Sequence, residues 1–123
     1  MIGYVTLGTN DLPRAAAFYD ALLGIIGAKR IMENDQFIAW STWHDKPGLA
    51  LTKPFNGKPA TIGNGTMVAF GVASQDIVKA LHAKALELGG TDEGAPGERF
   101  EGFYAAYFRD PDGNKLNAHV GNG

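Results

Sequence analysis

Two stretches of this chain follow one pattern. Residues 4–27 read YVTLGTNDLPRAAAFYDALLGIIG, and residues 67–90 read MVAFGVASQDIVKALHAKALELGG. The two align from end to end without a gap, and they agree in residue character more than in identity, as where Leu7 meets Phe70. An internal repeat determines the architecture, because each copy folds into the same supersecondary unit. The sequence therefore predicts two similar modules.

Each copy begins like a strand and continues like a helix. The opening residues alternate between apolar and polar, which is typical of a half-buried strand. Apolar residues then recur at helical spacing. Asn10 or Asp11 can cap the first helix, with Pro13 in its first turn, and Ser74 is suited to cap the second. Glycines after both helices are suited to the left-handed backbone that ends a helix.

Further strand-like runs follow each predicted helix. The turn before the last strand also repeats, as DKPG over residues 45–48 and DPDG over residues 110–113. Each half therefore reads strand, helix and three strands. Module one covers about residues 1–55, a linker rich in Pro, Gly and Asn covers 56–65, and module two covers 66–123. The later strands are predicted over 28–33, 37–43, 48–53, 102–108 and 115–120, with a weaker candidate at 97–100.

Composition narrows the class of protein. The chain has 123 residues, of which 45% are hydrophobic, so it is long enough to build a core. Its formal net charge of −2 gives no basic footprint for nucleic acid, and no apolar run is long enough to span a membrane. It has no cysteine, which excludes disulfides and thiolate ligands. We expect a cytoplasmic protein without nucleic-acid or membrane partners.

The last predicted strand carries two polar side chains on one face. Because successive side chains of a strand point to opposite sides, Asn117 and His119 share one face, and Leu116, Ala118 and Val120 share the other. Two interpretations stand. The pair either braces the fold through a hydrogen bond or binds a ligand, with the imidazole suited to general acid-base work.

The repeat and two motifs resemble a known superfamily. The motifs are YVTLGTNDLPRAAAFYDALLG over residues 4–24 and FRDPDGNKLNAHV over residues 108–120. They resemble the vicinal oxygen chelate superfamily, which includes glyoxalase I, extradiol dioxygenases and the bleomycin- and fosfomycin-resistance proteins. The resemblance implies an α+β fold in which two tandem βαβββ modules form a cupped, partly open mixed β-barrel with helices outside and a cleft inside.

The resemblance also identifies four positions where metal-dependent members hold a cation. These positions are Tyr4, Ala50, Met67 and Asn117 in this chain. Divalent metals prefer imidazole or carboxylate donors, and none of the four side chains supplies one. We therefore expect no cofactor. A divalent metal is the alternative, and it requires a relocated site that uses His119, His44 or a partner chain.

The residue types, together with this resemblance, predict which residues line a ligand site. His119 is the candidate catalytic residue, and Tyr4 is either a core tyrosine or part of the pocket. Met67 fills space and shapes a cleft, whereas His82, on the second predicted helix, is expected to face solvent. The residues predicted to bind ligand are Tyr4, Thr52, Met67, Asn117, His119 and Trp40.

Two functions follow from the resemblance. The leading hypothesis is a metal-independent protein that binds a small organic ligand in the barrel cleft, similar to the bleomycin-resistance branch, and that forms a homodimer. The alternative is a metal-dependent lyase or dioxygenase of the glyoxalase or extradiol type with non-standard ligands. The sequence leaves open whether the protein catalyses any reaction.

Overall fold

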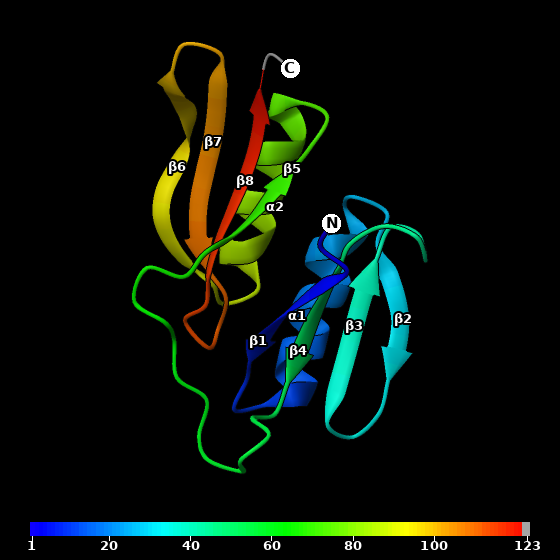
Figure 1. Ribbon diagram of the computed structural model, residues 1–123. Coiled ribbons are helices and arrows are strands. Elements are labelled where there is room, and N and C mark those ends of the chain that lie inside the picture. The colour runs from blue at the N-terminus through cyan, green and yellow to red at the C-terminus, as the bar shows by residue number, and fades with distance from the viewer. Residues whose placement is uncertain (122–123) are drawn as a thin grey trace. The chain divides into compact units, whose positions relative to one another are not determined.

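The computed structural model describes residues 1–121, which form two units, one of residues 1–62 and one that begins at residue 63. Each unit has the order β-α-β-β-β, as the repeat predicts (Figure 1). The first unit comprises β1 (Tyr4–Gly8), α1 (Leu12–Gly24), β2 (Lys29–Glu33), β3 (Phe37–Ser41) and β4 (Gly48–Thr52). The second comprises β5 (Val68–Gly71), α2 (Gln75–Glu87), β6 (Thr91–Phe100), β7 (Phe103–Arg109) and β8 (Lys115–Gly121).

The strands of residues 1–121 form two four-stranded mixed sheets, not one closed barrel. The strand order is β1-β4-β3-β2 in the first sheet and β5-β8-β7-β6 in the second. In each sheet the first and last strands of the module pair in parallel, and the remaining neighbours are antiparallel. The α+β fold of two βαβββ modules is therefore confirmed.

Each helix begins directly after a residue whose side chain caps its N-terminus. Asp11 is the N-cap of α1 and accepts a hydrogen bond from the Arg14 amide, with Pro13 in the first turn. Ser74 caps α2 by accepting from the amide of Ile77 at 3.2 Å. These bonds satisfy amide groups that have no partner inside a helix, so both predicted starts are confirmed.

The core of the first unit lies between α1 and one face of its sheet. Val5 and Leu7 of β1 are paired with Leu49 and Leu51 of β4, and in a parallel ladder such partners point to the same face. Leu51 is fully buried there. The helix contributes an apolar stripe at helical spacing, made of Leu12, Ala15, Ala16, Phe18, Tyr19, Leu22 and Leu23.

The second unit repeats this arrangement with α2 (Figure 1). Val78, Leu81 and Ala85 of the helix are fully buried, as are Phe108 and Leu116 of the sheet. Because β7 and β8 pair Phe108 with Leu116, these two side chains share the face that packs against α2. One face of each sheet is thus covered by the helix of the same unit.

The expected solvent exposure of His82 is wrong. His82 is 8% exposed, and its Nε2 lies 2.9 Å from Asp92 Oδ1, to which it donates a hydrogen bond. Its ring also meets the Phe108 ring edge to face at 6.2 Å. The carboxylate satisfies the imidazole, so a polar side chain at an apolar helix position is tolerated. The same bond, followed by one from the Gly94 amide, lowers the pKa of Asp92.

Strand β6 is longer than the weak candidate at 97–100. It covers Thr91–Phe100, and its pairing with β7 shifts register three times. Each shift moves the following side chains to the other face, which destroys the alternation that identifies a strand in a sequence. Pro96 lies in this edge strand at the register shift between Gly94 and Gly97, and proline, which has no amide donor, is tolerated at such edges and bulges.

Neither helix in residues 1–121 is long and apolar enough to cross a membrane.

Candidate functional site

Each sheet has a second face that its own helix does not cover. In the second unit we call this surface the helix-free face. Strand pairing assigns its members, because residues directly opposite one another share a face. They are Ala69 and Gly71 of β5, Phe103, Ala105, Tyr107 and Arg109 of β7, and Lys115, Asn117, His119 and Gly121 of β8.

Asn117 and His119 meet on the helix-free face, as the alternation of β8 predicts. The His119 Nδ1 lies 2.7 Å from Asn117 Oδ1. An amide oxygen only accepts, so the imidazole donates from Nδ1 and its Nε2 is left as an acceptor in the neutral ring. Asn117 is 1% exposed, whereas His119 is partly exposed. The buried amide therefore fixes the orientation of a ring that solvent reaches.

Aromatic rings continue from the imidazole. The His119 ring stacks on Phe103 at 5.3 Å between centroids and an interplanar angle of 27°. Phe103 stacks in turn on Phe100 at 4.9 Å and 6°. Phe100 is 65% exposed although it is a large apolar side chain. The two phenyl rings therefore extend a stack that begins at the imidazole, and the Phe100 end of this stack is open to solvent.

Gly71 leaves space beside the imidazole. It pairs directly with His119, and a Cβ built on it would lie 3.5 Å from His119 Nε2. Its backbone is not in the left-handed region, so no turn requires a glycine here. The missing side chain therefore leaves the acceptor nitrogen accessible from the β5 side.

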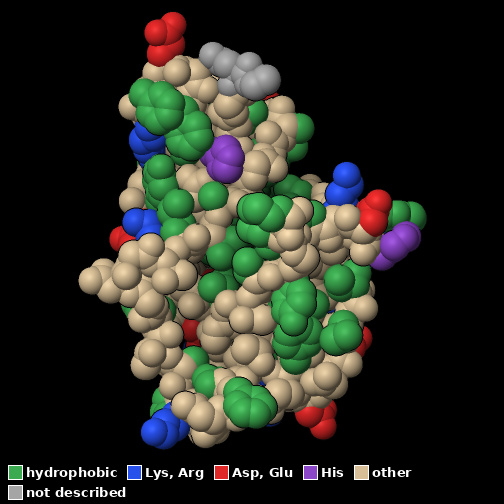
Figure 2. Space-filling view, in the orientation of Figure 1, with side chains coloured by type: hydrophobic (Ala, Val, Ile, Leu, Met, Phe, Trp, Pro, Cys, Tyr) green, Lys and Arg blue, Asp and Glu red, His purple; other side chains and the backbone are tan. Residues whose placement is uncertain are grey.

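Basic side chains surround Tyr107, the direct partner of Asn117 on β7. The Arg99 guanidinium lies 5.4 Å from the Tyr107 ring centroid, and the Lys115 ammonium lies 5.6 Å from it. Both distances fit cation–π contacts. Arg99 is held by hydrogen bonds to two backbone carbonyl oxygens, those of Ala95 and Gly97. Figure 2 shows basic groups and a histidine beside hydrophobic side chains in the region of the second unit.

The first sheet places Tyr4 and Thr52 on the side away from α1. Tyr4 is 63% exposed and meets the Phe37 ring edge to face at 6.2 Å. Thr52 donates from its hydroxyl to the Lys53 carbonyl oxygen at 2.9 Å. Met67, in the second unit, directly precedes β5 and is 42% exposed. Tyr4 is therefore not a core tyrosine.

Trp40 requires a correction, because it does not line a ligand site. It is 1% exposed, and its indole N–H donates to Asp20 Oδ1 of α1 at 2.8 Å. Its ring also packs against Tyr19 of the same helix at 5.7 Å. Trp40 therefore points to the helix-covered face and belongs to the core. Sequence reasoning left the register of β3 open, and this register decides the face.

Phe103, Phe100 and Arg99 are site residues that sequence reasoning missed. The signal for Phe103 is its diagonal position: it pairs with Gly121, two residues beyond His119, and diagonal neighbours on a face come within reach of aromatic side chains. Arg99 and Phe100 carry no such signal, since they lie after the register shifts of β6.

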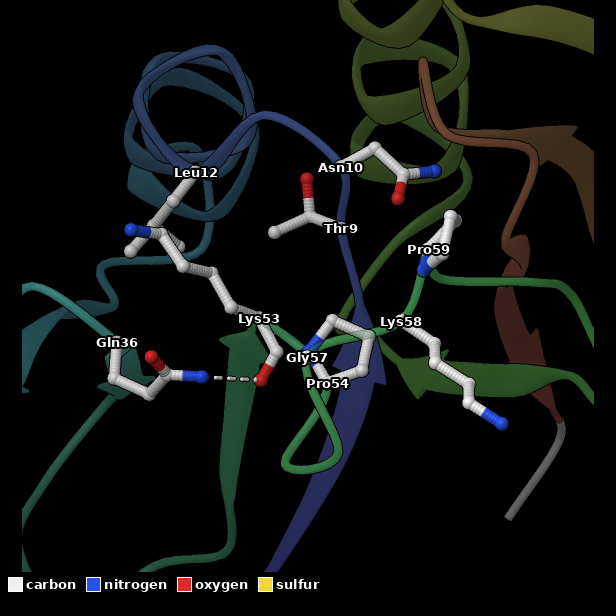
Figure 3. A pocket seen from close by; sticks show the side chains of 9 residues that line it. All are labelled: Thr9, Asn10, Leu12, Gln36, Lys53, Pro54, Gly57, Lys58 and Pro59. Atoms are coloured by element: carbon white, nitrogen blue, oxygen red, sulfur yellow. Dashed lines mark hydrogen bonds between the residues drawn. The ribbon is translucent and has the colours of Figure 1, made fainter.

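A cavity of about 360 Å³ lies in the first unit beside the start of α1 (Figure 3). Figure 3 shows Lys53 and Lys58 extending toward opposite sides, so their charges do not converge. The Asn10 amide is engaged with the Ala60 backbone in both directions, at 3.1 and 2.7 Å. These bonds fix the segment that follows β4, and we assign the cavity no chemistry.

The donor set does not fit a divalent metal. At the four positions identified by resemblance, Ala50 and Met67 offer no hard donor, Asn117 offers a neutral oxygen already bonded to His119, and Tyr4 is a phenol. Within residues 1–121, no three His, Asp or Glu side chains lie close enough together to hold an ion.

Comparison with known proteins agrees with the fold. The sequence profile described as the Glyoxalase/Bleomycin resistance protein/Dioxygenase superfamily matches residues 1–118. A glyoxalase/bleomycin resistance protein from Albidiferax ferrireducens T118 is 40% identical, with 98% of each chain covered and a TM-score of 0.89. No curated protein matches the chain.

Two more distant structures share the fold alone. A putative glyoxalase from Bacillus halodurans is 22% identical, with 98% of this chain and 95% of that chain covered and a TM-score of 0.80. A lactoylglutathione lyase from Agrobacterium tumefaciens is also 22% identical, with 98% and 93% covered and a TM-score of 0.72. The profile match and the 40% identical structure show that this chain belongs to the glyoxalase/bleomycin resistance/dioxygenase superfamily.

Proposed function

We propose that this protein binds a small organic ligand without a metal and that the helix-free face of the second unit is the binding surface. The observation that carries the proposal is the Asn117–His119 hydrogen bond beside the stacked rings of Phe103 and Phe100. This arrangement combines an oriented polar group with an apolar wall, which is the usual composition of a small-molecule site.

The hydrogen bond supports a binding role because it engages Nδ1 of His119 and leaves Nε2 for a ligand. Asn117 occupies Nδ1, so the Nε2 of His119 is available to a ligand, and Gly71 leaves room for one. A side chain that only braced the fold would need no accessible atom. We therefore interpret Asn117 as a positioning residue and His119 as the ligand-contacting residue.

The donor chemistry supports the absence of a metal from the mechanism. The reactions of metal-dependent relatives use a cation to polarise oxygen atoms of the substrate. Here the inherited positions carry Tyr4, Ala50, Met67 and Asn117, which do not form a set of imidazole or carboxylate donors. The competing function is a metal-dependent lyase or dioxygenase, and it would need ligands from elsewhere.

The test has a metal arm and a ligand arm. In the metal arm, the purified protein undergoes elemental analysis and calorimetric titration with Mn, Fe, Ni and Zn salts. We expect no stoichiometric metal and no tight uptake. Uptake of one equivalent with micromolar or better affinity would contradict the proposal and favour the metal-dependent enzyme.

In the ligand arm, a library of small organic compounds is screened by NMR against the full chain. We expect hits that shift the signals of His119 and Phe103 and that lose affinity in Asn117→Ala and His119→Ala. His44→Ala is the matched control, because His44 is exposed and its ring lies tilted against Trp43, outside the proposed surface. Hits that leave the His119 signals unshifted, or variants that lose stability yet bind the hits as tightly as the unmodified chain, would favour the bracing interpretation.

A further inference from the structure

We infer that the ligand of the helix-free face is a planar organic anion that carries a hydrogen-bond donor. This inference rests on the proposed function and names the class of ligand for the same surface. The cations of this face, its aromatic rings and the His119 imidazole each indicate one property of the ligand.

Arg99 and Lys115 favour a negatively charged ligand. Both cations lie over the Tyr107 ring, at 5.4 and 5.6 Å, on the face that also carries His119. The other basic group there, Arg109, pairs with Glu93 at 2.6 Å and is neutralised. Although the whole chain has a net charge of −2, a bound ligand responds mainly to charges within about 10 Å. Glu98 pairs with Tyr104, whose side chain lies on the opposite face of the sheet, so the charges on the helix-free face itself have a positive surplus.

The stacked aromatic rings favour a planar ligand. The rings of Phe100 and Phe103 stack nearly parallel, with 6° between their planes, and His119 continues the series. A planar molecule that lies across the edges of these rings makes edge-to-face contacts with several of them while staying within reach of His119, whereas a puckered ring of the same size makes fewer contacts. The exposed fraction of Phe100, 65%, leaves area for these contacts.

His119 favours a ligand that carries a hydrogen-bond donor. In the tautomer whose Nδ1 donates to Asn117, the Nε2 of the ring is an acceptor. A hydroxyl or N–H group of the ligand satisfies this acceptor. Tyr107 and His119 are diagonal neighbours, about 7–8 Å apart, and this is close to the length of one substituted aromatic ring. One small molecule can therefore reach both the cations and the imidazole.

The experiment compares probes that differ in one property each. Benzoate, benzamide and benzamidine share size and flatness and differ in charge. Cyclohexanecarboxylate keeps the charge of benzoate but is not flat, and 4-hydroxybenzoate adds a donor. Each probe is titrated into the full chain, and the NMR signals of His119, Phe103 and Tyr107 report the dissociation constant.

We expect 4-hydroxybenzoate to bind more tightly than benzoate, and benzoate to bind more tightly than benzamide, benzamidine or cyclohexanecarboxylate. Lys115→Gln should weaken benzoate binding by about two- to fivefold, the effect of one exposed charge contact. Lys79→Gln is the matched control, since Lys79 is exposed on α2 and the same charge is removed on the other side of the sheet. It should leave benzoate binding unchanged.

The outcomes separate the two levels of the proposal. If benzamidine or benzamide shifts the His119 and Phe103 signals with higher affinity than benzoate, the ligand class is wrong while the surface remains a binding site. If Lys79→Gln weakens benzoate binding as much as Lys115→Gln, the loss of affinity comes from the net charge of the protein and not from a contact with Lys115. The inference about the ligand class then also fails. If none of the probes shifts these signals, both the ligand class and the proposed surface are refuted.

Discussion

Gly71→Ala tests the helix-free face while leaving the fold in place. The added Cβ would lie 3.5 Å from His119 Nε2 and 3.9 Å from Cε1, which are ordinary van der Waals contacts. The substitution is therefore sterically tolerated. Replacing glycine also restricts the unfolded chain, which stabilises a compatible site by about 0.4–1 kcal/mol. We expect the free energy of unfolding to stay the same or rise slightly.

Ligand binding should respond in the opposite direction. A donor approaches an acceptor nitrogen to about 2.7–3.2 Å, and a methyl group at 3.5 Å occupies part of that approach. Loss of this hydrogen bond costs about 1–2 kcal/mol, or roughly a five- to thirtyfold increase in Kd. The assay pairs urea denaturation with NMR titration of 4-hydroxybenzoate on the same protein samples.

Gly90→Ala is the matched glycine control. A Cβ built on Gly90 would lie 2.5 Å from the Arg109 carbonyl oxygen and 2.7 Å from that of Ala85, and these backbone atoms must move. We expect a loss of about 1–3 kcal/mol of stability from this overpacking. If Gly71→Ala destabilises the chain as much as Gly90→Ala, or if it leaves binding of 4-hydroxybenzoate intact, the reasoning about open space beside His119 is refuted.

Three further predictions concern the cores and the pH dependence of stability. Trp40→Phe should cost about 1–3 kcal/mol in urea denaturation, because it removes the indole bond to the Asp20 carboxylate; an unchanged midpoint would contradict the core assignment. Leu81→Ala should cost about 2–5 kcal/mol, whereas Leu86→Ala, at a site 38% exposed, should cost far less, and equal losses would contradict the packing described for α2. Hydrogen bonds from Arg30, and then from Trp40, lower the pKa of Asp20, so its contribution to stability is present above its unfolded pKa of about 3.9 and is lost as pH falls through the lower folded value. Asp20→Asn should therefore flatten the acid limb of a stability–pH profile, and an unaltered limb would exclude this carboxylate as a source of acid sensitivity.

The repeat made most of the fold predictable from the sequence. Local signals determined both helix starts, where Asp11 and Ser74 accept hydrogen bonds from backbone amides. The resemblance placed Ala50 and Asn117 at equivalent positions of the two modules, and the structure pairs them with Thr6 and Ala69, which are equivalent residues of β1 and β5. Caps, turns and alternation act over a few residues, so one sequence is enough to recognise them.

The errors arose where long-range contacts decide the outcome. His82 looked like a surface residue until Asp92, ten positions away, supplied the partner that lets it be buried. Trp40 was predicted to bind ligand, but the face to which it points depends on the register of β3 against its partner strands, and a single sequence does not determine this register. The aromatic surface was missed for a related reason: the register shifts of β6 bring Phe100 beside Phe103 without any periodic signal.

The central claim is that an organic ligand reaches the His119 surface by contacts with protein groups alone. Calorimetric titration of 4-hydroxybenzoate into protein treated with a chelator, repeated after addition of Mn or Zn, tests this claim most directly. We predict the same affinity in both titrations, and its loss in His119→Ala. Binding that requires the added metal would contradict the account.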